Sequence, residues 1–198
     1  MGAGPLEESP GEKEVAGARI RAFFGLPLPE AERDSLAPFL AACVDAAPMF
    51  RWTPVANLHF TVRFIGQVDR AVVERVADRL AAMPLQGFGL ELGELGIFKR
   101  GRLARVVWLG LRAGAVELTA LAGQVDAECV AAGLVGEKRG FQAHLTLARA
   151  RAQYGAVLPE LPPPPRLGPW RADGLVLYQS RLGRAGAVYE ALRVVKLD

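Results

Sequence analysis

Two short segments of the chain alternate strictly between apolar and other side chains, and this pattern restricts the possible folds more than any other feature. Because successive side chains of a β-strand point to opposite faces, alternation over a run of this length predicts a strand with one buried face. The two segments are residues 58–66 and 141–148. Their predicted buried faces carry Leu58, Phe60, Val62 and Phe64 in the first segment and Phe141, Ala143, Leu145 and Leu147 in the second.

The rest of the chain predicts helices and further strands in mixed order. Apolar residues at helical spacing predict helices over residues 29–47, where Pro38 delays or bends the helix, over 70–84 behind the capping residue Asp69, and over 115–132, ended by Gly133. Further strands are predicted at residues 19–26, 88–98, 105–111, 174–180 and 188–195, and a loop at the prolines of 162–165. Because helices and strands do not alternate regularly, we predict the α+β class.

The polar faces of the two alternating strands carry the same pair of residues. His59 is followed two residues later by Thr61, and His144 by Thr146, in a chain that has 2 histidines. A step of two residues along a strand points both side chains to one face. Each predicted strand therefore presents an imidazole beside a hydroxyl, on the face opposite its buried one.

Paired imidazoles suit acid/base chemistry at phosphorus. The unperturbed pKa of imidazole is about 6.5, so one ring is able to take a proton from water while the other protonates a departing oxygen. The hydroxyls of Thr61 and Thr146 are suited to donate to the charged, non-bridging phosphate oxygens. A structural role is the usual one for a single strand histidine, but the duplication favours catalysis by His59 and His144. Metal binding needs a third ligand, and the sequence suggests none.

Both pairs extend to the motif H-x-T-x, here His59-Phe60-Thr61-Val62 and His144-Leu145-Thr146-Leu147. These paired motifs resemble those of the two-histidine phosphoesterases, and most closely the bacterial and archaeal RNA 2′,3′-cyclic phosphodiesterases, also known as 2′-5′ RNA ligases. The resemblance covers about residues 19–197. It is carried by residues 21–29, 57–66, 106–110, 139–149 and 177–180.

The resemblance implies a bilobal, pseudo-twofold α+β fold in which two antiparallel sheets flanked by helices surround a central cleft. It implies hydrolysis of RNA 2′,3′-cyclic phosphate ends to 2′-phosphomonoesters without a metal or cofactor, with a weak reverse 2′-5′ ligation. By the same resemblance His59 protonates the leaving O3′, His144 activates water, and Arg149 contacts the phosphate. The residues alone leave the direction of proton transfer open.

Two positions depart from the pattern of many relatives. Ala143 stands where proline often precedes the second histidine, and Arg63 stands where a small residue is frequent. If the alternation continues, Arg63 lies on the histidine face, where it contacts RNA or is a solvated charge. Further candidates for RNA contact, each with a surface or core role as the alternative, are Arg139, the basic residues Lys99, Arg100, Arg102 and Arg105, and the aromatic residues Trp52 and Phe64.

Composition narrows the setting of this predicted domain, residues 19–198. The chain has 2 cysteines, Cys43 and Cys129, in apolar helical contexts, which favours buried free thiols and a cytoplasmic location. No apolar run is long enough for a membrane span, and residues 1–18 are interpreted as a disordered tail. The net charge of +3 permits an anionic substrate but does not identify one. We expect a monomer.

Two alternatives to RNA-end hydrolysis remain open at this point. One is a phosphodiesterase acting on another small cyclic phosphate nucleotide, such as ADP-ribose 1″,2″-cyclic phosphate. The other is a non-catalytic binder of RNA ends, although such a binder needs arginine more than it needs two imidazoles.

Overall fold

A computed structural model describes residues 18–183 and 186–198. The predicted tail therefore lies outside the described residues, except for Ala18. The α-helices are α1 (Glu30–Ala46), α2 (Arg70–Ala81) and α3 (Ala115–Ala131), and η1 (Val55–Asn57) is a short 3-10 helix. The strands are β1 (Arg19–Pro27), β2 (Phe50–Trp52), β3 (His59–Asp69), β4 (Phe88–Arg100), β5 (Leu103–Ala113), β6 (Leu145–Ala150), β7 (Trp170–Ala172), β8 (Gly174–Gly183) and β9 (Gly186–Lys196).

The α+β class is confirmed, and the described strands pair in the order β7-β4-β5-β6-β3-β1-β8-β9, with β2 beside β6. All pairs are antiparallel. Two sheets were predicted, but the described strands join into one 9-stranded sheet, because β3 and β6 share the residue pair Phe60↔Leu145 in the middle of this order. Both of these residues are fully buried, so the junction lies in the core.

The two sides of this junction are built alike. On one side β1 leads through α1 to β3, and on the other β5 leads through α3 to β6. In each case the first strand pairs antiparallel with the strand that follows the helix. The order strand, helix, strand is thus shared by the two halves, as the predicted pseudo-twofold symmetry requires, although β2 and η1 lie between α1 and β3 in the first half only.

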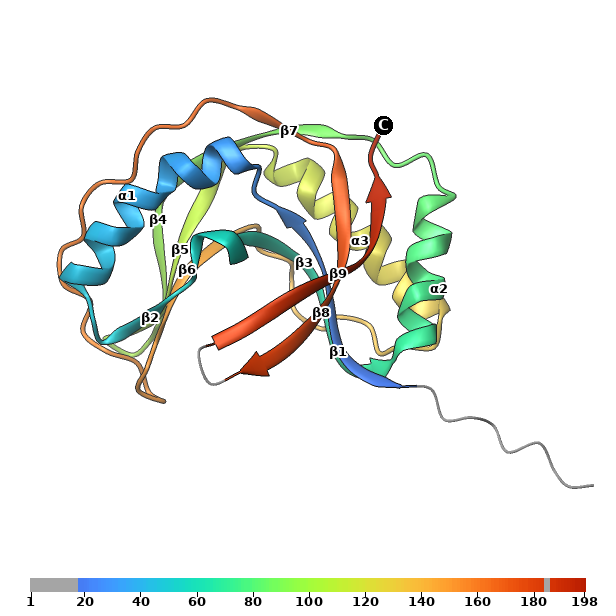
Figure 1. The fold of residues 1–198 in the computed structure, drawn as a ribbon, viewed down its shortest axis with the longest axis horizontal. Coiled ribbons are helices and arrows are strands. Elements are labelled where there is room, and N and C mark those ends of the chain that lie inside the picture. The colour runs from blue at the N-terminus through green and yellow to red at the C-terminus, as the bar shows by residue number, and fades with distance from the viewer. Residues whose placement is uncertain (1–17, 184–185) are drawn as a thin grey trace, which may run out of the picture.

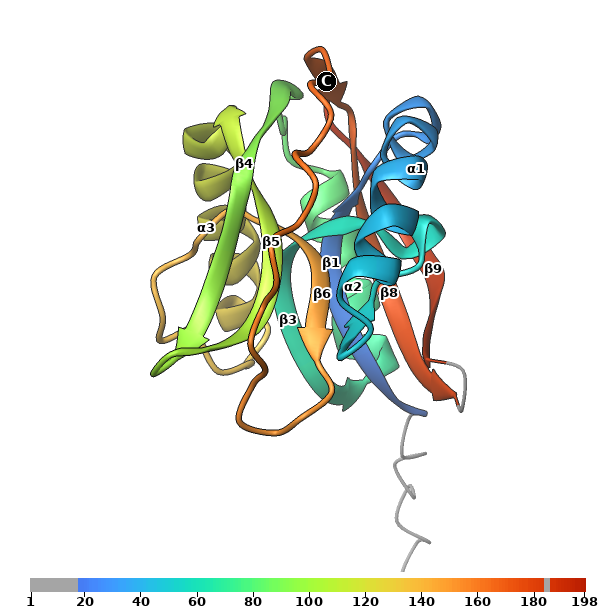
Figure 2. The same cartoon turned by 90° about the vertical axis from the view of Figure 1, so that its left-hand side faces the viewer.

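Helices cover the sheet from different sides. Helices α2 and α3 contact each other and lie side by side (Figure 1). Helix α1 lies apart from α3, on the far side of the strands, and contacts η1 and β2 (Figure 2). None of the helices in the described part of the chain is long and apolar enough to cross a membrane.

The apolar faces expected from helical spacing are the ones that are buried. Helix α1 runs from Glu30 through Pro38, so the proline does not delay its start. The N-cap of α2 is Asp69, whose carboxylate accepts a hydrogen bond from Ala71 N, and Gly133 follows α3 with a positive φ of 84°. The elements that the sequence did not predict are β2, β7 and η1. Each is 3 residues long, which is too short to show a periodic pattern.

Candidate active site

The two histidines lie at the junction of the two halves, one residue before the pair Phe60↔Leu145 in each strand. His59 is the first residue of β3, as expected from the alternation. The prediction that His144 lies within a strand is wrong, because β6 begins at Leu145. Residues 141–144 alternate between apolar and polar side chains but pair with no neighbouring strand. Without backbone hydrogen bonds to a partner, this segment is not part of the sheet.

Each histidine ring is held by the same backbone hydrogen bond. His59 Nδ1 lies 2.7 Å from Asn57 O, and His144 Nδ1 lies 2.7 Å from Gln142 O. A carbonyl oxygen only accepts, so each Nδ1 carries the proton and donates it. The neutral form of each ring then leaves Nε2 unprotonated, as the atom available to take or return a proton.

The two threonines differ in their contacts. Thr61 Oγ1 lies 3.0 Å from His59 Nε2, and with Nδ1 protonated the hydroxyl is the donor of this hydrogen bond. Within the described residues, no hydrogen bond joins Thr146 Oγ1 to His144. The Thr61 hydroxyl therefore holds His59 Nε2, whereas Thr146 leaves its own hydroxyl free for another acceptor.

A β-bulge follows each threonine. In β3 the pairs Gly25↔Thr61 and Phe24↔Arg63 skip Val62, and in β6 the pairs Trp108↔Thr146 and Val107↔Ala148 skip Leu147. A bulge adds one unpaired residue and reverses which face the following side chains point to. In both halves the bulged residue is thus the last position of the H-x-T-x motif.

The bulge overturns two predictions in the first half. Arg63 is 9% exposed, rather than a free charge on the histidine face, and Phe64 is 45% exposed, rather than part of the core. The strict alternation holds only as far as Val62, because the extra residue shifts the phase by one. Trp52, the other aromatic candidate, is half-buried and its Nε1 donates to Ala47 O at 3.1 Å.

Arg63 joins the first half to the loop that carries His144. Its Nε lies 2.7 Å from Asp126 Oδ1 of α3, and its Nη1 lies 3.3 Å from Glu137 Oε2. Its Nη2 also donates to the carbonyl of Val135. Asp126 in turn accepts a hydrogen bond from Glu137 N at 3.1 Å. The residue is therefore a buried structural cation, and the solvated charge expected of it is wrong. Arg63 also lines a cleft together with His144, so its contact with RNA stays a prediction.

Aromatic rings that sequence reasoning did not assign to the site surround both imidazoles. The ring centroid of His59 lies 4.8 Å from that of Phe23 and 5.1 Å from that of Tyr189. The ring of His144 lies 5.0 Å from Phe98 and 6.1 Å from Trp108. These residues come from β1, β9, β4 and β5, far from the histidines along the chain, so the linear sequence contains no spacing that would have found them.

Burial and neighbouring cations set the protonation of the site. Desolvation lowers the pKa of His59, and the charges of Arg149 and His144 lower it further, against the opposing effect of the Asn57 carbonyl. Desolvation and then Arg149 likewise lower the pKa of His144, opposed by the Gln142 carbonyl. Both rings are thus biased toward the neutral form, and Arg149 acts on both.

Arg149 belongs to a group of cations beside the histidines. Burial lowers its pKa, and the charges of Arg51 and Arg105 lower it further. Arg51 is its cross-strand partner, and sequence reasoning did not single it out. None of these three guanidinium groups takes part in an ion pair with a described carboxylate. Like charges kept together in this way favour an anionic ligand.

A cleft of about 760 Å³ lies beside His144, whereas His59, Thr146 and Arg51 are not among the residues that line it. Its lining includes His144, Thr61 and Arg149, together with the sequence-predicted candidates Lys99, Arg105 and Arg139. The candidates Arg100 and Arg102 do not line it, although Arg100 lies at the end of the same hairpin. The strand before this hairpin was predicted to end at residue 98, with a loop over residues 99–102. The turn is tighter than that, so Lys99 and Arg100 belong to β4.

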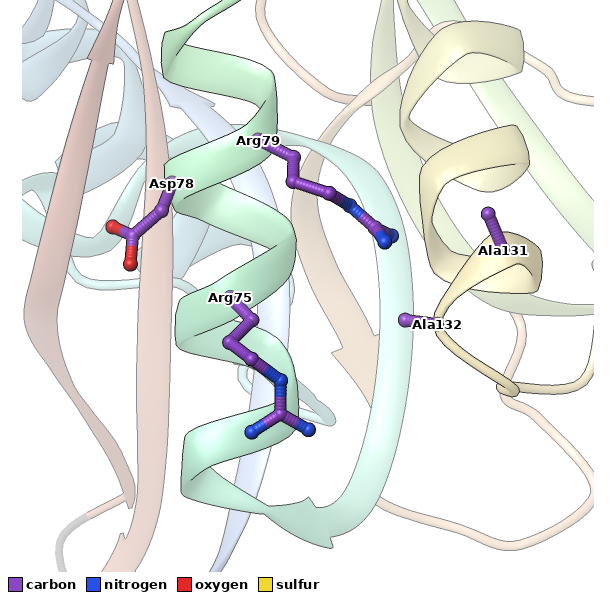
Figure 3. Close-up of a pocket in the computed structure, with 5 residues that line it drawn as sticks. All are labelled: Arg75, Asp78, Arg79, Ala131 and Ala132. Carbon is purple, nitrogen blue, oxygen red and sulfur yellow. The ribbon is translucent and has the colours of Figure 1, made fainter.

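A second pocket, of about 450 Å³, lies between α2 and α3, away from the histidines (Figure 3). Two of the charged residues that line it belong to ion pairs with neighbouring elements. Arg79 lies 2.9 Å from Glu128, and Asp78 lies 3.7 Å from Arg193. Apart from these, its lining consists of Arg75 and two alanines. A single further guanidinium beside methyl groups provides no acid/base pair, so this pocket is not a second catalytic site.

The prediction for the two cysteines concerns residues outside the cleft. Cys43 and Cys129 are buried free thiols, as expected, and burial raises the pKa of each to about 11. Over residues 18–183 and 186–198, no group of three or more His, Cys, Asp or Glu side chains is placed to hold a metal ion.

Comparison with known proteins identifies a repeated family pattern. A model of the LigT-like phosphoesterases matches the chain twice, over residues 26–108 and 109–189. The boundary between the matches falls in β5, so each match contains one histidine motif. Between them, the two matches cover most of the chain.

Several proteins named RNA 2′,3′-cyclic phosphodiesterase are similar in sequence. The one from Aeropyrum pernix is 36% identical over 146 residues, which cover 71% of this chain and 82% of that protein. The one from Escherichia coli K12 is 31% identical over 176 residues, which cover 87% of this chain and 94% of that protein.

Solved structures of similar proteins have the same fold. Escherichia coli LigT complexed with 3′-AMP superposes with a TM-score of 0.78 at 26% identity, covering 91% of this chain and 99% of that one. A protein of Thermus thermophilus superposes with a TM-score of 0.74 at 26% identity, covering 90% and 98%.

Proposed function

This chain belongs to the LigT-like phosphoesterase family, and from that premise we propose that it hydrolyses 2′,3′-cyclic phosphates at RNA ends to 2′-phosphomonoesters. The observation that carries the proposal is the matched pair of imidazoles. His59 and His144 each donate Nδ1–H to a carbonyl at 2.7 Å, which makes Nε2 the reactive atom of both rings. Arg149 adds the fixed positive charge that a phosphate requires.

In the proposed reaction, water attacks phosphorus while the bond from phosphorus to O3′ breaks. His144 Nε2 takes a proton from the water, and protonated His59 gives its Nε2 proton to O3′. The product is a 2′-phosphomonoester with a free 3′-hydroxyl, and the two imidazoles have exchanged their protonation states. The direction, from His144 as base to His59 as acid, comes from the family resemblance.

Binding of the anionic substrate favours the protonated form of the imidazole that acts as the acid. Both histidines have a lowered pKa in the free protein, which disfavours the acid form of either ring. An anionic cyclic phosphate beside a ring stabilises the imidazolium and raises its pKa. The hydroxyls of Thr61 and Thr146 and the guanidinium of Arg149 then bind the non-bridging oxygens, whose charge is present throughout the reaction.

The same groups account for a weak reverse activity. If the 5′-hydroxyl of a second RNA replaces water, the base removes its proton and the acid protonates O3′, which leaves a 2′-5′ phosphodiester. Water is far more abundant than RNA ends, so hydrolysis dominates in dilute solution.

RNA is the substrate class that the surroundings favour. Several relatives are named for this activity, and one similar structure was solved with 3′-AMP. In this chain, Lys99, Arg105 and Arg139 line the cleft beside the histidines, where they suit the phosphates of a polynucleotide. The monomeric state and the cytoplasmic location stay predictions.

Phosphorus NMR of the protein with a nucleoside 2′,3′-cyclic phosphate and excess EDTA tests the proposal. We expect rapid and exclusive formation of the 2′-monophosphate. A strict need for added Mg²⁺ or Zn²⁺ contradicts the metal-independent mechanism, and formation of the 3′-isomer contradicts the assigned leaving group. Parallel reactions with ADP-ribose 1″,2″-cyclic phosphate and with a cyclic-phosphate-ended RNA distinguish a small-nucleotide enzyme, and RNA binding without turnover identifies a non-catalytic binder.

A further inference from the structure

The carbonyl that orients the His59 ring belongs to Asn57, a residue that is itself fastened to a distant strand. Asn57 O lies 2.7 Å from His59 Nδ1. The side-chain amide of the same residue donates a hydrogen bond of 2.8 Å, from Nδ2 to Ala187 O of β9. Ala187 lies two residues before Tyr189, whose ring centroid is 5.1 Å from that of His59. One residue thus joins the reactive ring of the first half to the last strand of the sheet.

The backbone around Asn57 needs such an anchor. Asn57 is the last residue of η1, a 3-10 helix of 3 residues. The N–H groups of Asn57 and Leu58 donate within that turn, to Pro54 O and Val55 O. A 3-10 turn of this length has poor hydrogen-bond geometry and little stability of its own. The side-chain bond to β9 is therefore a tertiary contact that fixes the end of the turn, and with it the direction of the Asn57 carbonyl.

The Asn57 carbonyl also selects the tautomer of His59. A carbonyl oxygen only accepts, whereas the Thr61 hydroxyl, 3.0 Å from Nε2, is able to donate or to accept. The hydroxyl therefore does not choose between the two neutral forms of the ring, and the carbonyl does. Desolvation lowers the pKa of His59, and the hydrogen bond to Asn57 opposes this effect. The same carbonyl thus leaves Nε2 as the reactive atom and favours the protonated ring that an acid requires.

The second half has an amide at the same place and uses it differently. Gln142 precedes its histidine by two residues, as Asn57 does in the first half. The Gln142 side chain is exposed and lines the cleft, and its amide has no hydrogen-bond partner among the described residues. The loop that carries Gln142 is held instead by the ion pair between Arg63 and Glu137. The amide is thus part of the support of the ring in the first half and not in the second.

On the premise of the proposed function, we propose that Asn57 is the positioning residue of His59, because its carboxamide fastens to β9 the carbonyl that orients the imidazole. Asn57 reaches the reaction only through the histidine, so it acts on proton transfer to O3′ and not on binding of the phosphate. Its loss should therefore lower kcat. The KM depends on the groups that bind the phosphate, Arg149 and the two threonines, and should change little.

The first test is the tautomer of His59, read by histidine-selective nitrogen NMR at a pH where both rings are neutral. In the wild-type protein, His59 should show a protonated Nδ1 and an unprotonated Nε2. Asn57→Ala removes the amide, and His59 should then show a mixture of the two tautomers while the His144 signals stay unchanged. Asn57→Asp keeps the shape of the side chain but cannot donate to Ala187 O, so it should give the same mixture.

The second test is kinetic and uses a nucleoside 2′,3′-cyclic phosphate. The kcat of Asn57→Ala should fall roughly tenfold to a hundredfold, because a small displacement of the acid slows proton transfer, and its KM should stay close to the wild-type value. Arg171→Ala is the matched control. It also removes a side-chain-to-backbone hydrogen bond, of 2.9 Å to Asp198 O, but Arg171 does not line the cleft. This variant should keep the wild-type kcat and both histidine signals.

The proposal is overturned if Asn57→Ala shows neither the change in tautomer nor the loss of kcat, or only one of them. It is also overturned if the signals of both histidines change alike, since the effect is then not specific to the first half. Wild-type behaviour of Asn57→Asp contradicts the role of the hydrogen bond to β9. The tautomer measurement requires no turnover. If the wild-type protein hydrolyses no cyclic phosphate, the proposed function fails while the NMR experiment still decides whether Asn57 positions the ring.

Discussion

The half of the molecule around His59 and the half around His144 share their backbone and differ in their side chains. Both have a strand, a helix and a second strand, a ring whose Nδ1 donates to the carbonyl two residues earlier, and a bulge after the threonine. These shared features orient the reactive nitrogen. The orientation of each histidine therefore depends on the local backbone geometry of its own half.

The differences lie in what surrounds that common frame. His59 contacts Phe23 and Tyr189 and receives a hydrogen bond from Thr61, whereas His144 is flanked by Phe98 and Trp108. The loop before His59 is short and contains η1. The loop before His144 runs from the end of α3 and is fastened by ion pairs. The anchoring of the loop thus resides in a part where the two halves differ.

The largest expected effect tests whether both halves contribute equally to the chemistry. His59→Ala and His144→Ala should each lower kcat/KM by roughly a hundredfold or more, because each removes one proton-transfer group. Steady-state kinetics on a nucleoside 2′,3′-cyclic phosphate gives the numbers, and circular dichroism confirms that each variant is folded. Near-normal turnover in either variant means that one histidine is only structural.

The second effect concerns Arg149, the cation of the second half. Arg149→Ala removes a charged hydrogen-bond donor to the phosphate, which is worth about 1.5–3 kcal/mol, or roughly tenfold to a hundredfold in kcat/KM. Because every substrate carries the phosphate, the loss should be the same with and without a base. A loss confined to substrates that carry a base contradicts the assignment of Arg149 to the phosphate.

The third effect concerns the anchored loop. Arg63→Ala leaves Asp126 and Glu137 without the guanidinium that they contact. Both carboxylates are partly exposed and water replaces part of the contact, so we expect a loss of about 1–2 kcal/mol of unfolding free energy. We also expect broadening or splitting of the His144 signal in histidine-selective NMR, while the His59 signal stays sharp. The chain has 2 histidines, so His59→Ala assigns both signals.

Arg79→Ala is the matched control for this loop. Arg79 pairs with Glu128 of the same helix, α3, at 2.9 Å but lies outside the cleft. This variant should leave both histidine signals unchanged. If Arg63→Ala is destabilised but keeps a sharp, unshifted His144 signal, the ion pairs stabilise the fold without positioning the ring.

The smallest effect concerns the titration of the two rings. Burial and Arg149 lower the pKa of both, so we expect both to titrate below pH 6.5. The optimum of kcat/KM should therefore lie on the acid side of 6.5, and that of kcat at higher pH, because bound phosphate raises the pKa.

NMR titration of the two histidine signals measures these values directly. Arg149→Ala should raise both, since its charge acts on both rings. The lowered pKa values also affect the stability of the fold. Between the folded pKa and 6.5, the unfolded chain binds more protons than the folded one. Each histidine therefore lowers the free energy of unfolding as the pH falls through this window. A pKa above 6.5 for either ring in the free protein contradicts this account.

Helix positions were predictable because helical periodicity is a local property. The buried faces of α1 and α3 are the apolar stripes read from the sequence, Asp69 caps the start of α2, and Gly133 follows the end of α3, as expected. The continuation of β3 was not predictable in the same way. The position of a bulge depends on how the neighbouring strand pairs, and the sequence near Val62 contains no signal that predicts one.

By itself, the sequence determined the two histidine–threonine pairs, the α+β class and the apolar stripes, because each follows from residue types at short, regular spacing. Only the tertiary structure decided that Arg63 is buried and Phe64 exposed, that His144 precedes its strand, and which aromatic rings surround each imidazole. These outcomes depend on strand register and on contacts between residues far apart in the chain, and such contacts leave no periodic signal in the sequence.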